Sequence, residues 1–315
     1  MKNGPPILCV GGMHFDCLAQ SLAPFHMKAS NPVRYTRVAG GVAHNVACDL
    51  VGLGTPSSLL SLVGDDADGD AILKDTKQRG VDLALVSQLP SVTTASYTAV
   101  LDTDGELAVG LSDTETYNLM TPEFLTPDRG AVQAHQTLVV DANLPAESLE
   151  WLGKNKGQAR LFAAPVSPSK ALRWKRAIRH VDVFIGNERE ADQLTGVPVK
   201  TVKDALNAAR ALRGQGPQVV VVTLGPQGAV ISGPDLEAHF SIPETNVVDV
   251  NGAGDAFFSG FTSAVNADLS LAEAMALGIA TASIMAEVPG PIWHGLTAGL
   301  VNTRLESVPP YNNLF

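Results

Sequence analysis

Two carboxylates and a turn of small residues lie together in the segment Asp249-Val-Asn-Gly-Ala-Gly-Asp255, which runs directly into the apolar stretch 256–261. The small residues let the backbone turn tightly where a helix begins. Unpaired N–H groups and the positive end of the helix dipole then face an incoming anion. Asp255, in the first helical turn, repels a phosphate, but it can accept a proton from a hydroxyl group that attacks that phosphate. The pattern therefore predicts phosphoryl transfer to an alcohol.

The same segment also fits an ordinary helix start, in which Asp249 or Asp255 simply caps the helix. Capping needs one acceptor, whereas two carboxylates here flank three exposed amides. We therefore favour the anion site over the cap.

A second glycine pair occurs in Gly40-Gly41-Val-Ala-His-Asn45, at the entrance of a helix whose apolar positions lie within 46–53. Glycines there allow a ligand to approach the backbone closely. Asn45 offers a donor and an acceptor to vicinal hydroxyls, and Asp16, expected at a strand end, can accept two hydroxyl hydrogens. A glycine turn followed by a capping Asn gives the same letters, so both interpretations stay open. We expect His44 on the surface of this helix.

Two further motifs follow predicted strands. Asn187 and Glu190 are three residues apart at a helix start, where they can hold a hydrated magnesium ion or form a capping box. The segment Thr223-Leu-Gly-Pro-Gln-Gly228 can cover a nucleotide or turn a hairpin. Both alternatives stay open for each motif.

Other nucleotide-binding motifs are absent from the sequence. It has no Gly-x-x-x-x-Gly-Lys-Ser/Thr and no His-Arg-Asp loop, and the segment 11–16 does not fit Gly-x-Gly-x-x-Gly. P-loop enzymes, protein kinases and dinucleotide dehydrogenases are therefore disfavoured.

Composition is that of a globular protein: 315 residues, 45% hydrophobic and 17% charged, with a net charge of −10. The negative charge opposes binding to nucleic acid or to anionic membranes. Cys9, Cys17 and Cys48 form no paired motif and are expected to be free buried thiols. No signal-like N-terminus and no apolar window of about 18 residues is found, so we expect a cytoplasmic protein without a membrane span.

The elements that must position these motifs fall into two groups. A buried strand at 7–10 is followed by β-rich segments at 30–38, 93–101 and 106–110, which predict a small separate sheet with a hairpin at 102–105.

After residue 130, strands alternate with helices, which predicts a parallel sheet with crossover helices. The strands are expected at 137–140, 161–164, 181–185 and 219–223, and the helices at 147–154, 171–179, 202–213, 256–265 and 271–286. No repeat or linker is found, so the chain is expected to be one α/β domain with the small sheet as a lid.

Taken together, the four motifs resemble, in order and spacing, the ribokinase-like (PfkB) carbohydrate and nucleoside kinases, along nearly the whole chain. The resemblance implies a three-layer α/β/α sandwich with a mostly parallel central sheet. It also implies a lid formed by about residues 14–38 and 93–112, a sugar under the lid, and ATP with Mg²⁺ across the carboxyl edge of the sheet. Lid strands often pair between subunits in this family, so the resemblance also implies a homodimer.

The family's functional residues carry over by position. The base falls on Asp255, and the anion hole on Gly252, Ala253 and Gly254. Sugar-binding positions fall on Asp16, Gly40, Gly41 and Asn45. Positions that organise magnesium and phosphate fall on Asn187 and Glu190. Nucleotide-loop positions fall on Thr223, Gly225 and Gly228, with adenine expected near 280–283, including Ser283. A monovalent ion such as potassium is implied near Asp249 and the loop 288–290.

Within the family, the chain is similar to the pseudouridine kinases. It shares Ser30-Asn31-Pro32, Gly40-Gly-Val42 and Pro165-Val-Ser167 with them, and Asn143 stands where ribokinases usually carry Glu. The expected reaction is phosphorylation of the 5′-hydroxyl of pseudouridine. Ala164 replaces an Asp that relatives place before this proline, near the magnesium. The alternatives are a kinase of ribose, adenosine or inosine and, given Ala164, a catalytically silent nucleoside-binding protein.

Overall fold

A ten-stranded sheet forms the centre of the computed structural model, which describes residues 4–314. Its order is β14-β13-β12-β11-β10-β9-β8-β1-β4-β5. The seven strands from β11 to β5 in this order pair in parallel, whereas β12, β13 and β14 pair antiparallel with their neighbours at the other end. The parallel strands are β1 (Ile7–Val10), β4 (Ser57–Gly64), β5 (Asp82–Leu89), β8 (Thr137–Asp141), β9 (Arg160–Ala164), β10 (Val183–Asn187) and β11 (Val219–Thr223). The antiparallel ones are β12 (Ala229–Ser232), β13 (Glu237–Phe240) and β14 (Asn312–Asn313).

The sheet is apolar on both faces because successive side chains of a strand point in opposite directions. In β1, Ile7 and Cys9 pack into one apolar cluster, whereas Leu8 and Val10 pack into another on the opposite face. All three cysteines are buried and free, as predicted.

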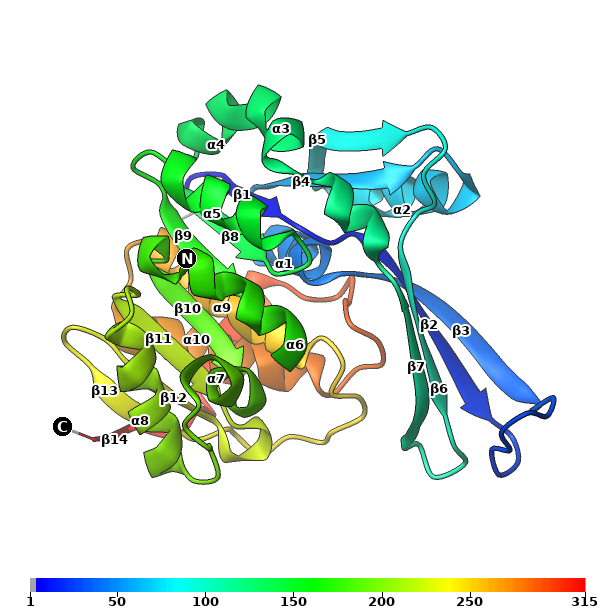
Figure 1. The fold of residues 1–315 in the computed structure, drawn as a ribbon. Coiled ribbons are helices and arrows are strands. Elements are labelled where there is room, and N and C mark those ends of the chain that lie inside the picture. The colour runs from blue at the N-terminus through cyan, green and yellow to red at the C-terminus, as the bar shows by residue number, and fades with distance from the viewer. Residues whose placement is uncertain (1–3, 315) are drawn as a thin grey trace.

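Helices cover both clusters (Figure 1). One face is covered by α1 (Val42–Gly52), α2 (Ala67–Gln78), α9 (Ala253–Asn266), α10 (Leu271–Met285) and α11 (Ala298–Leu305). The other is covered by α3 (Pro122–Leu125), α4 (Arg129–Ala134), α5 (Ala146–Asn155), α6 (Pro168–Ala171), α7 (Glu188–Thr195) and α8 (Val202–Arg213). This arrangement confirms the predicted three-layer α/β/α fold.

A second sheet of four strands projects away from the sandwich (Figure 1). Its order is β3 (Val33–Gly40), β2 (His14–Ser21), β6 (Ser96–Leu101) and β7 (Leu107–Asp113). The edge strands β3 and β7 are mostly exposed along their length. We call this four-stranded sheet the lid sheet, and its closing over a substrate stays a prediction.

The predicted helix at 171–179 is wrong. The chain instead forms the short helix α6, beginning at Pro168 after the cap Ser167, followed by 3₁₀ turns at Leu172–Arg176 and Ile178–His180. Packing decides this local shape: buried Trp174 donates its indole N–H to the carbonyl of Ala164 on β9, at 3.3 Å. No helix among residues 4–314 is both long and apolar enough to span a bilayer.

Candidate active site

A cavity of about 430 Å³ lies where α7 and α9 begin, at the carboxyl ends of β10 and β11. Parallel α/β sheets commonly bind ligands at this edge. Predicted site residues from separate parts of the chain meet in the cavity wall: Asn187, Glu190, Thr223, Gly252, Gly254 and Asp255. Ala164 lines the same cavity.

The beginning of α9 has the geometry of an anion site. Gly252 is the N-cap residue with φ of 78°, and no side chain caps the helix. A Cβ on Gly252 would overlap the carbonyl oxygen of Pro291, so both the space and the backbone angle require glycine. Among residues 4–314, the N–H groups of Gly254 and Asp255 have no hydrogen-bond partner, whereas that of Ala253 donates to Val250 O at 3.2 Å. The free amides are therefore at Gly254 and Asp255, whereas the N–H of Ala253, also predicted for the anion hole, already has a partner.

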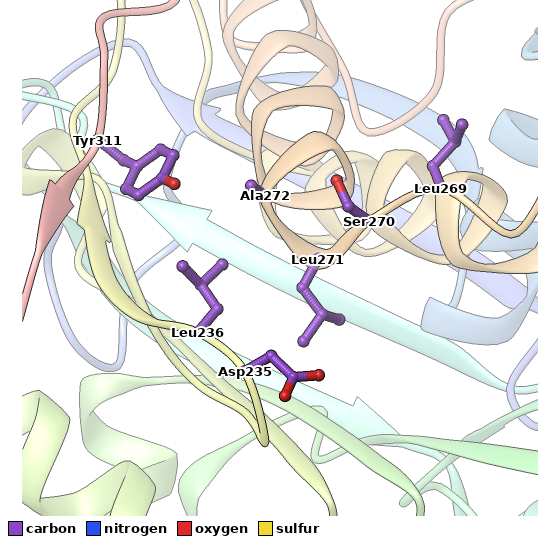
Figure 2. A pocket seen from close by; sticks show the side chains of 7 residues that line it. All are labelled: Asp235, Leu236, Leu269, Ser270, Leu271, Ala272 and Tyr311. Atoms are coloured by element: carbon purple, nitrogen blue, oxygen red, sulfur yellow. The ribbon is translucent and has the colours of Figure 1, made fainter. Parts of the chain in front are cut away.

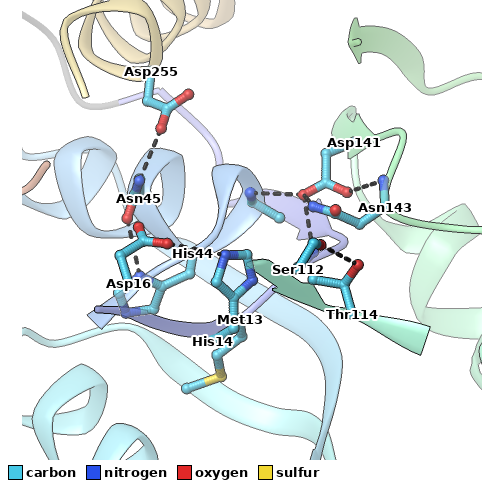
Figure 3. Close-up of polar contacts among 12 residues, drawn as sticks. Met13, His14, Asp16, His44, Asn45, Ser112, Thr114, Asp141, Asn143 and Asp255 are labelled. Carbon is cyan, nitrogen blue, oxygen red and sulfur yellow. Dashed lines mark hydrogen bonds and ion pairs between the residues drawn. The ribbon is translucent and has the colours of Figure 1, made fainter. Parts of the chain in front are cut away.

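Asp255 lies at the mouth of this helix, facing α1 (Figure 3). Its Oδ2 accepts a hydrogen bond from Asn45 Nδ2 at 2.8 Å. Burial raises the pKa of Asp255 to about 7, opposed by the Asn45 hydrogen bond and reinforced by the negative charges of Asp141, Asp16 and Glu190. A carboxylate whose pKa lies near neutral pH is suited to act as a general base.

The glycine pair at 40–41 joins the lid sheet to α1. A Cβ on Gly40 would overlap the carboxylate of Asp16, and one on Gly41 would overlap the carbonyl of Gly12. The pair thus lets three backbone segments meet beside Asp16. Asp16 lies inside β2 of the lid sheet, within the predicted lid range 14–38 but not at a strand end as expected.

Two histidines contact the predicted sugar-binding residues. His14 Nε2 lies 3.4 Å from Asp16 Oδ1. The expectation that His44 lies on the surface is wrong: its side chain is fully buried against Asn45 and Thr76. The helical pattern of α1 could not reveal this burial, because the ring of His44 is covered from outside α1 by Thr76 of α2, 32 residues along the chain.

Asp141 is a site residue that the sequence reasoning missed. Its carboxylate is fully buried and accepts hydrogen bonds from the backbone N–H groups of Gly12 at 2.9 Å, Ala43 at 3.0 Å and Asn143 at 2.8 Å. It therefore ties the loop after β1, the beginning of α1 and the end of β8 together. A carboxylate directly after a buried strand was the available signal.

Asn143 is held on both sides of its amide. Its Nδ2 donates to Asp141 Oδ2 at 3.1 Å, and its Oδ1 accepts from Lys170 Nζ at 2.6 Å. Burial lowers the pKa of Lys170, while the charge of Asp141 opposes this shift. The orientation of the Asn143 amide is thus set by charged neighbours before any substrate binds.

Asn187 and Glu190 form the capping box that the sequence left open. Asn187 Oδ1 accepts from the N–H of Glu190 at 3.0 Å, and Glu190 Oε2 accepts from the N–H of Asn187 at 2.8 Å. Burial raises the pKa of Glu190 to about 7. Both residues still line the cavity, so a magnesium role for them stays a prediction.

The loop 223–228 turns the hairpin between β11 and β12, with Leu224 N donating to Gly228 O at 2.8 Å. Of its predicted nucleotide residues, Thr223 lines the cavity and Gly225 and Gly228 lie in the turn. Ser283 does not line the cavity: it is buried in α10, where its hydroxyl donates to Ala280 O at 2.9 Å.

Asp249 links two loops beside α9. Its carboxylate accepts from Asn251 N at 2.9 Å and from Gly290 N at 3.0 Å. In the part of the chain that the structure describes, no group of three or more His, Cys, Asp or Glu residues could hold a metal ion by itself. Magnesium keeps several waters and needs few protein carboxylates when phosphates supply ligands.

A second hollow of about 400 Å³ lies near the beginning of α10 (Figure 2). Its wall is largely apolar, with Leu236, Leu271 and Tyr311, and Asp235 is its only carboxylate. The cavity at α9 differs from it in combining two carboxyl groups, Glu190 and Asp255, with an uncapped helix N-terminus.

Comparisons with known proteins agree with this geometry. Residues 6–294 match the family described as pfkB family carbohydrate kinase. Pseudouridine kinase of Escherichia coli (strain K12) is 30% identical over 264 residues, which cover 84% of each chain. Guanosine-inosine kinase of Exiguobacterium acetylicum is 29% identical over 300 residues, 94% of this chain and 98% of that one. The solved structure of Arabidopsis thaliana ribokinase complexed with ribose and ATP has a TM-score of 0.85 and 22% identity, covering 96% of this chain and 99% of that one, and shows the same fold.

Proposed function

The chain belongs to the pfkB family of carbohydrate kinases, which are phosphotransferases acting on hydroxyl groups, and on that premise we propose that it is an ATP-dependent pseudouridine kinase. The reaction is transfer of the γ-phosphoryl group of ATP to the 5′-hydroxyl of the nucleoside. The observation that carries the proposal is the pairing of Asp255, whose pKa is near neutral, with the uncapped N-terminus of α9.

In the proposed mechanism, Asp255 accepts the proton of the 5′-hydroxyl while that oxygen forms its bond to the γ-phosphorus. The bond from the γ-phosphorus to the bridging oxygen breaks, and ADP leaves with the bonding electrons. The free N–H groups of Gly254 and Asp255 stabilise the negative charge on the phosphoryl oxygens. Asp16, Asn45 and the backbone at 40–41 hold the ribose, with the lid sheet over it.

A magnesium ion bound with ATP would neutralise part of the phosphate charge. The donor set fits a largely water-coordinated ion, because Glu190 is the carboxylate that Asn187 and Thr223 accompany in the cavity wall and Ala164 adds no carboxylate. Adenine would lie near residues 280–283 of α10, without Ser283 lining the cavity. Asp249 and the loop 288–290, which its carboxylate contacts at Gly290, would hold a potassium ion that adds positive charge beside the phosphate site. Rates compared in potassium and choline salts test the latter, and equal rates would contradict it.

Two observations support pseudouridine as the acceptor. The 30% identical relative is a pseudouridine kinase, and Asn143 presents an amide whose orientation is fixed by Asp141 and Lys170. A purine nucleoside is the second candidate, because the guanosine-inosine kinase matches 94% of the chain at 29% identity.

The discriminating experiment is ADP release measured against pseudouridine, uridine, adenosine, inosine, guanosine and ribose at equal concentrations. We expect the largest kcat/KM for pseudouridine. A larger value for ribose or a purine nucleoside would show that the substrate assignment is wrong while leaving the kinase assignment intact. Absence of any phosphorylated product would support the silent nucleoside-binding protein instead.

We also propose that two copies pair through their lid sheets, since apolar residues of β3 and β7 such as Tyr35 and Leu111 are 56% and 57% exposed. Sedimentation of the whole protein tests this, and a monomer at all concentrations would contradict it. Because the reaction consumes ATP, we place the protein in the cytoplasm. The net charge of −10 argues against a nucleic-acid partner.

A further inference from the structure

We propose that His44 is a positioning residue for phosphoryl transfer, which holds the Asn45 amide so that its N–H points at Asp255. The inference rests on the proposed function, because Asp255 is the base of that reaction. It concerns a buried histidine that no step of the mechanism above uses.

A continuous row of hydrogen bonds runs from α2 through α1 to α9. His44 Nε2 lies 3.0 Å from Thr76 Oγ1, and its Nδ1 lies 3.2 Å from Asn45 Oδ1. Asn45 Nδ2 then donates to Asp255 Oδ2 at 2.8 Å. His44 is fully buried and Asn45 is 4% exposed, so water does not compete for these groups. Figure 3 shows His44, Asn45 and Asp255 in sequence.

Hydrogen-bond accounting assigns the proton on the imidazole. An ionised carboxylate only accepts, so the side of the Asn45 amide facing Asp255 must be the NH₂ group. Its oxygen therefore faces His44 Nδ1, and that nitrogen must carry hydrogen. Burial lowers the pKa of His44 to about 4, so the ring is neutral and has a single N–H.

Nε2 of this tautomer is an acceptor, and two donors surround it. One is the Thr76 hydroxyl, whose single hydrogen either donates to Ile72 O at 2.7 Å or turns to Nε2 at 3.0 Å. The Cys48 thiol, 3.6 Å from Nε2, is the second. Whichever way the single hydroxyl hydrogen of Thr76 points, Nε2 therefore has a donor, and the Nδ1–H tautomer is satisfied on both sides.

Charged and titratable groups act electrostatically on His44 and on Asp255, at the two ends of the row of hydrogen bonds. Those acting on His44 are Arg79 and Asp75 from the end of α2, and His14 from β2. Those acting on Asp255 are Asp141, Asp16 and Glu190, and its charge in turn acts on the buried Asp49 of α1. All four groups coupled to Asp255 are carboxylates, so the Asn45 N–H is the contact that favours its ionised form. An amide free to rotate would present its oxygen to Asp255 and disfavour the base.

The test compares His44→Phe, which keeps a ring but has no N–H, with His44→Gln, whose amide can donate to Asn45 Oδ1. We measure the pH dependence of kcat/KM for the best nucleoside from pH 5 to 9. In wild type, activity rises as Asp255 loses its proton near pH 7. In His44→Phe, the Asn45 amide is no longer held, and its hydrogen bond to the charged carboxylate of Asp255 is lost. We therefore expect the acid limb of the profile to move up by about one pH unit and kcat/KM at pH 6 to fall about tenfold. His44→Gln should restore most of both.

Two further variants separate positioning from general damage. In an Asn45→Ala background, His44→Phe should add almost nothing to the shift of the acid limb, because the path to Asp255 is already cut. His135→Phe is the matched control: its Nδ1 bonds only Ala131 O at the end of α4, at 2.7 Å, and it should leave the profile unchanged. An unmoved acid limb in His44→Phe, or full additivity with Asn45→Ala, would overturn the inference.

A measurement independent of activity distinguishes this inference from the proposed function. Nitrogen-15 NMR of histidine-labelled wild type should show His44 as the neutral Nδ1–H form between pH 6 and 8. An active kinase with the Nε2–H form would refute the role of His44 alone. An Nδ1–H form in a protein that phosphorylates no nucleoside would refute the proposed function alone.

Discussion

At the scale of single residues, the site depends on one carboxylate with an altered pKa. Asp255 gains its basicity from burial and from surrounding carboxylates, and Asn45 limits that effect. The predicted base and the predicted sugar-binding residue are thus one hydrogen-bonded unit. Asn45 retains one amide hydrogen and one oxygen lone pair for a substrate hydroxyl.

Replacing Asp255 with Asn should lower kcat by about 10² to 10⁴, because the amide cannot accept the hydroxyl proton. Nucleoside affinity should change little, since the ribose contacts come from other residues. Steady-state kinetics and calorimetric titration of the nucleoside measure the two effects. Turnover close to wild type would remove Asp255 from the mechanism.

At the scale of elements, the two glycines at the N-terminus of α9, Gly252 and Gly254, are needed for different reasons. Gly252 is required by its backbone angle and by Pro291, whereas a Cβ on Gly254 would meet no atom within 4 Å. Gly254 is therefore free of packing demands and borders the cavity where the phosphate is proposed to lie.

Gly254→Ala should fold normally, with an unfolding free energy unchanged or raised by up to about 1 kcal/mol, because Ala favours helices over Gly. Its methyl group would enter the phosphate site and lower kcat/KM by about 100-fold through misplacement of the reacting groups. Gly252→Ala is the contrasting variant: in addition to activity, it should lose about 1 to 2 kcal/mol or more of unfolding free energy. Urea unfolding and kinetics on both variants check this, and a fully active Gly254→Ala would contradict the phosphate site.

At the scale of the whole molecule, several buried carboxyl groups make stability depend on pH. Burial raises the pKa values of Asp255 and Glu190 to about 7, and raises that of Asp49 well above its ordinary value. Each group binds its proton more tightly in the folded than in the unfolded chain. Their stabilising contribution is complete below about pH 4 and is lost as pH rises toward 7.

We therefore expect the ligand-free protein to lose stability between about pH 5 and 7 from these groups. In urea unfolding across this range, the double variant Asp255→Asn with Glu190→Gln should show a flatter dependence on pH than wild type. Asp235→Asn, at an exposed position, is the control and should not alter the slope. Equal slopes in wild type and the double variant would show that these two groups do not titrate as described.

Local sequence determined much of this protein. Seven elements lie within a few residues of their predicted places: the strands β1, β8, β9 and β11 and the helices α5, α8 and α10. These elements were predictable because the periodicity of their apolar residues can be read from the local sequence. The turn before α9 and the residues meeting at the carboxyl edge of the sheet were likewise visible as motifs. No prediction was made for β4, β5 or α2, whose residues carry no motif.

Only the tertiary structure decided which groups are buried and which partners they meet. Asn45 and Asp255 are 210 residues apart, and their hydrogen bond forms because α1 and α9 pack together on one face of the sheet. The burial of His44, the central position of Asp141 and the broken helix after Pro168 follow from the same packing. The burial of a side chain and its long-range partners depend on how distant elements pack together. The pKa of a group depends on its burial and its partners, so none of the three could be obtained from spacing along the chain.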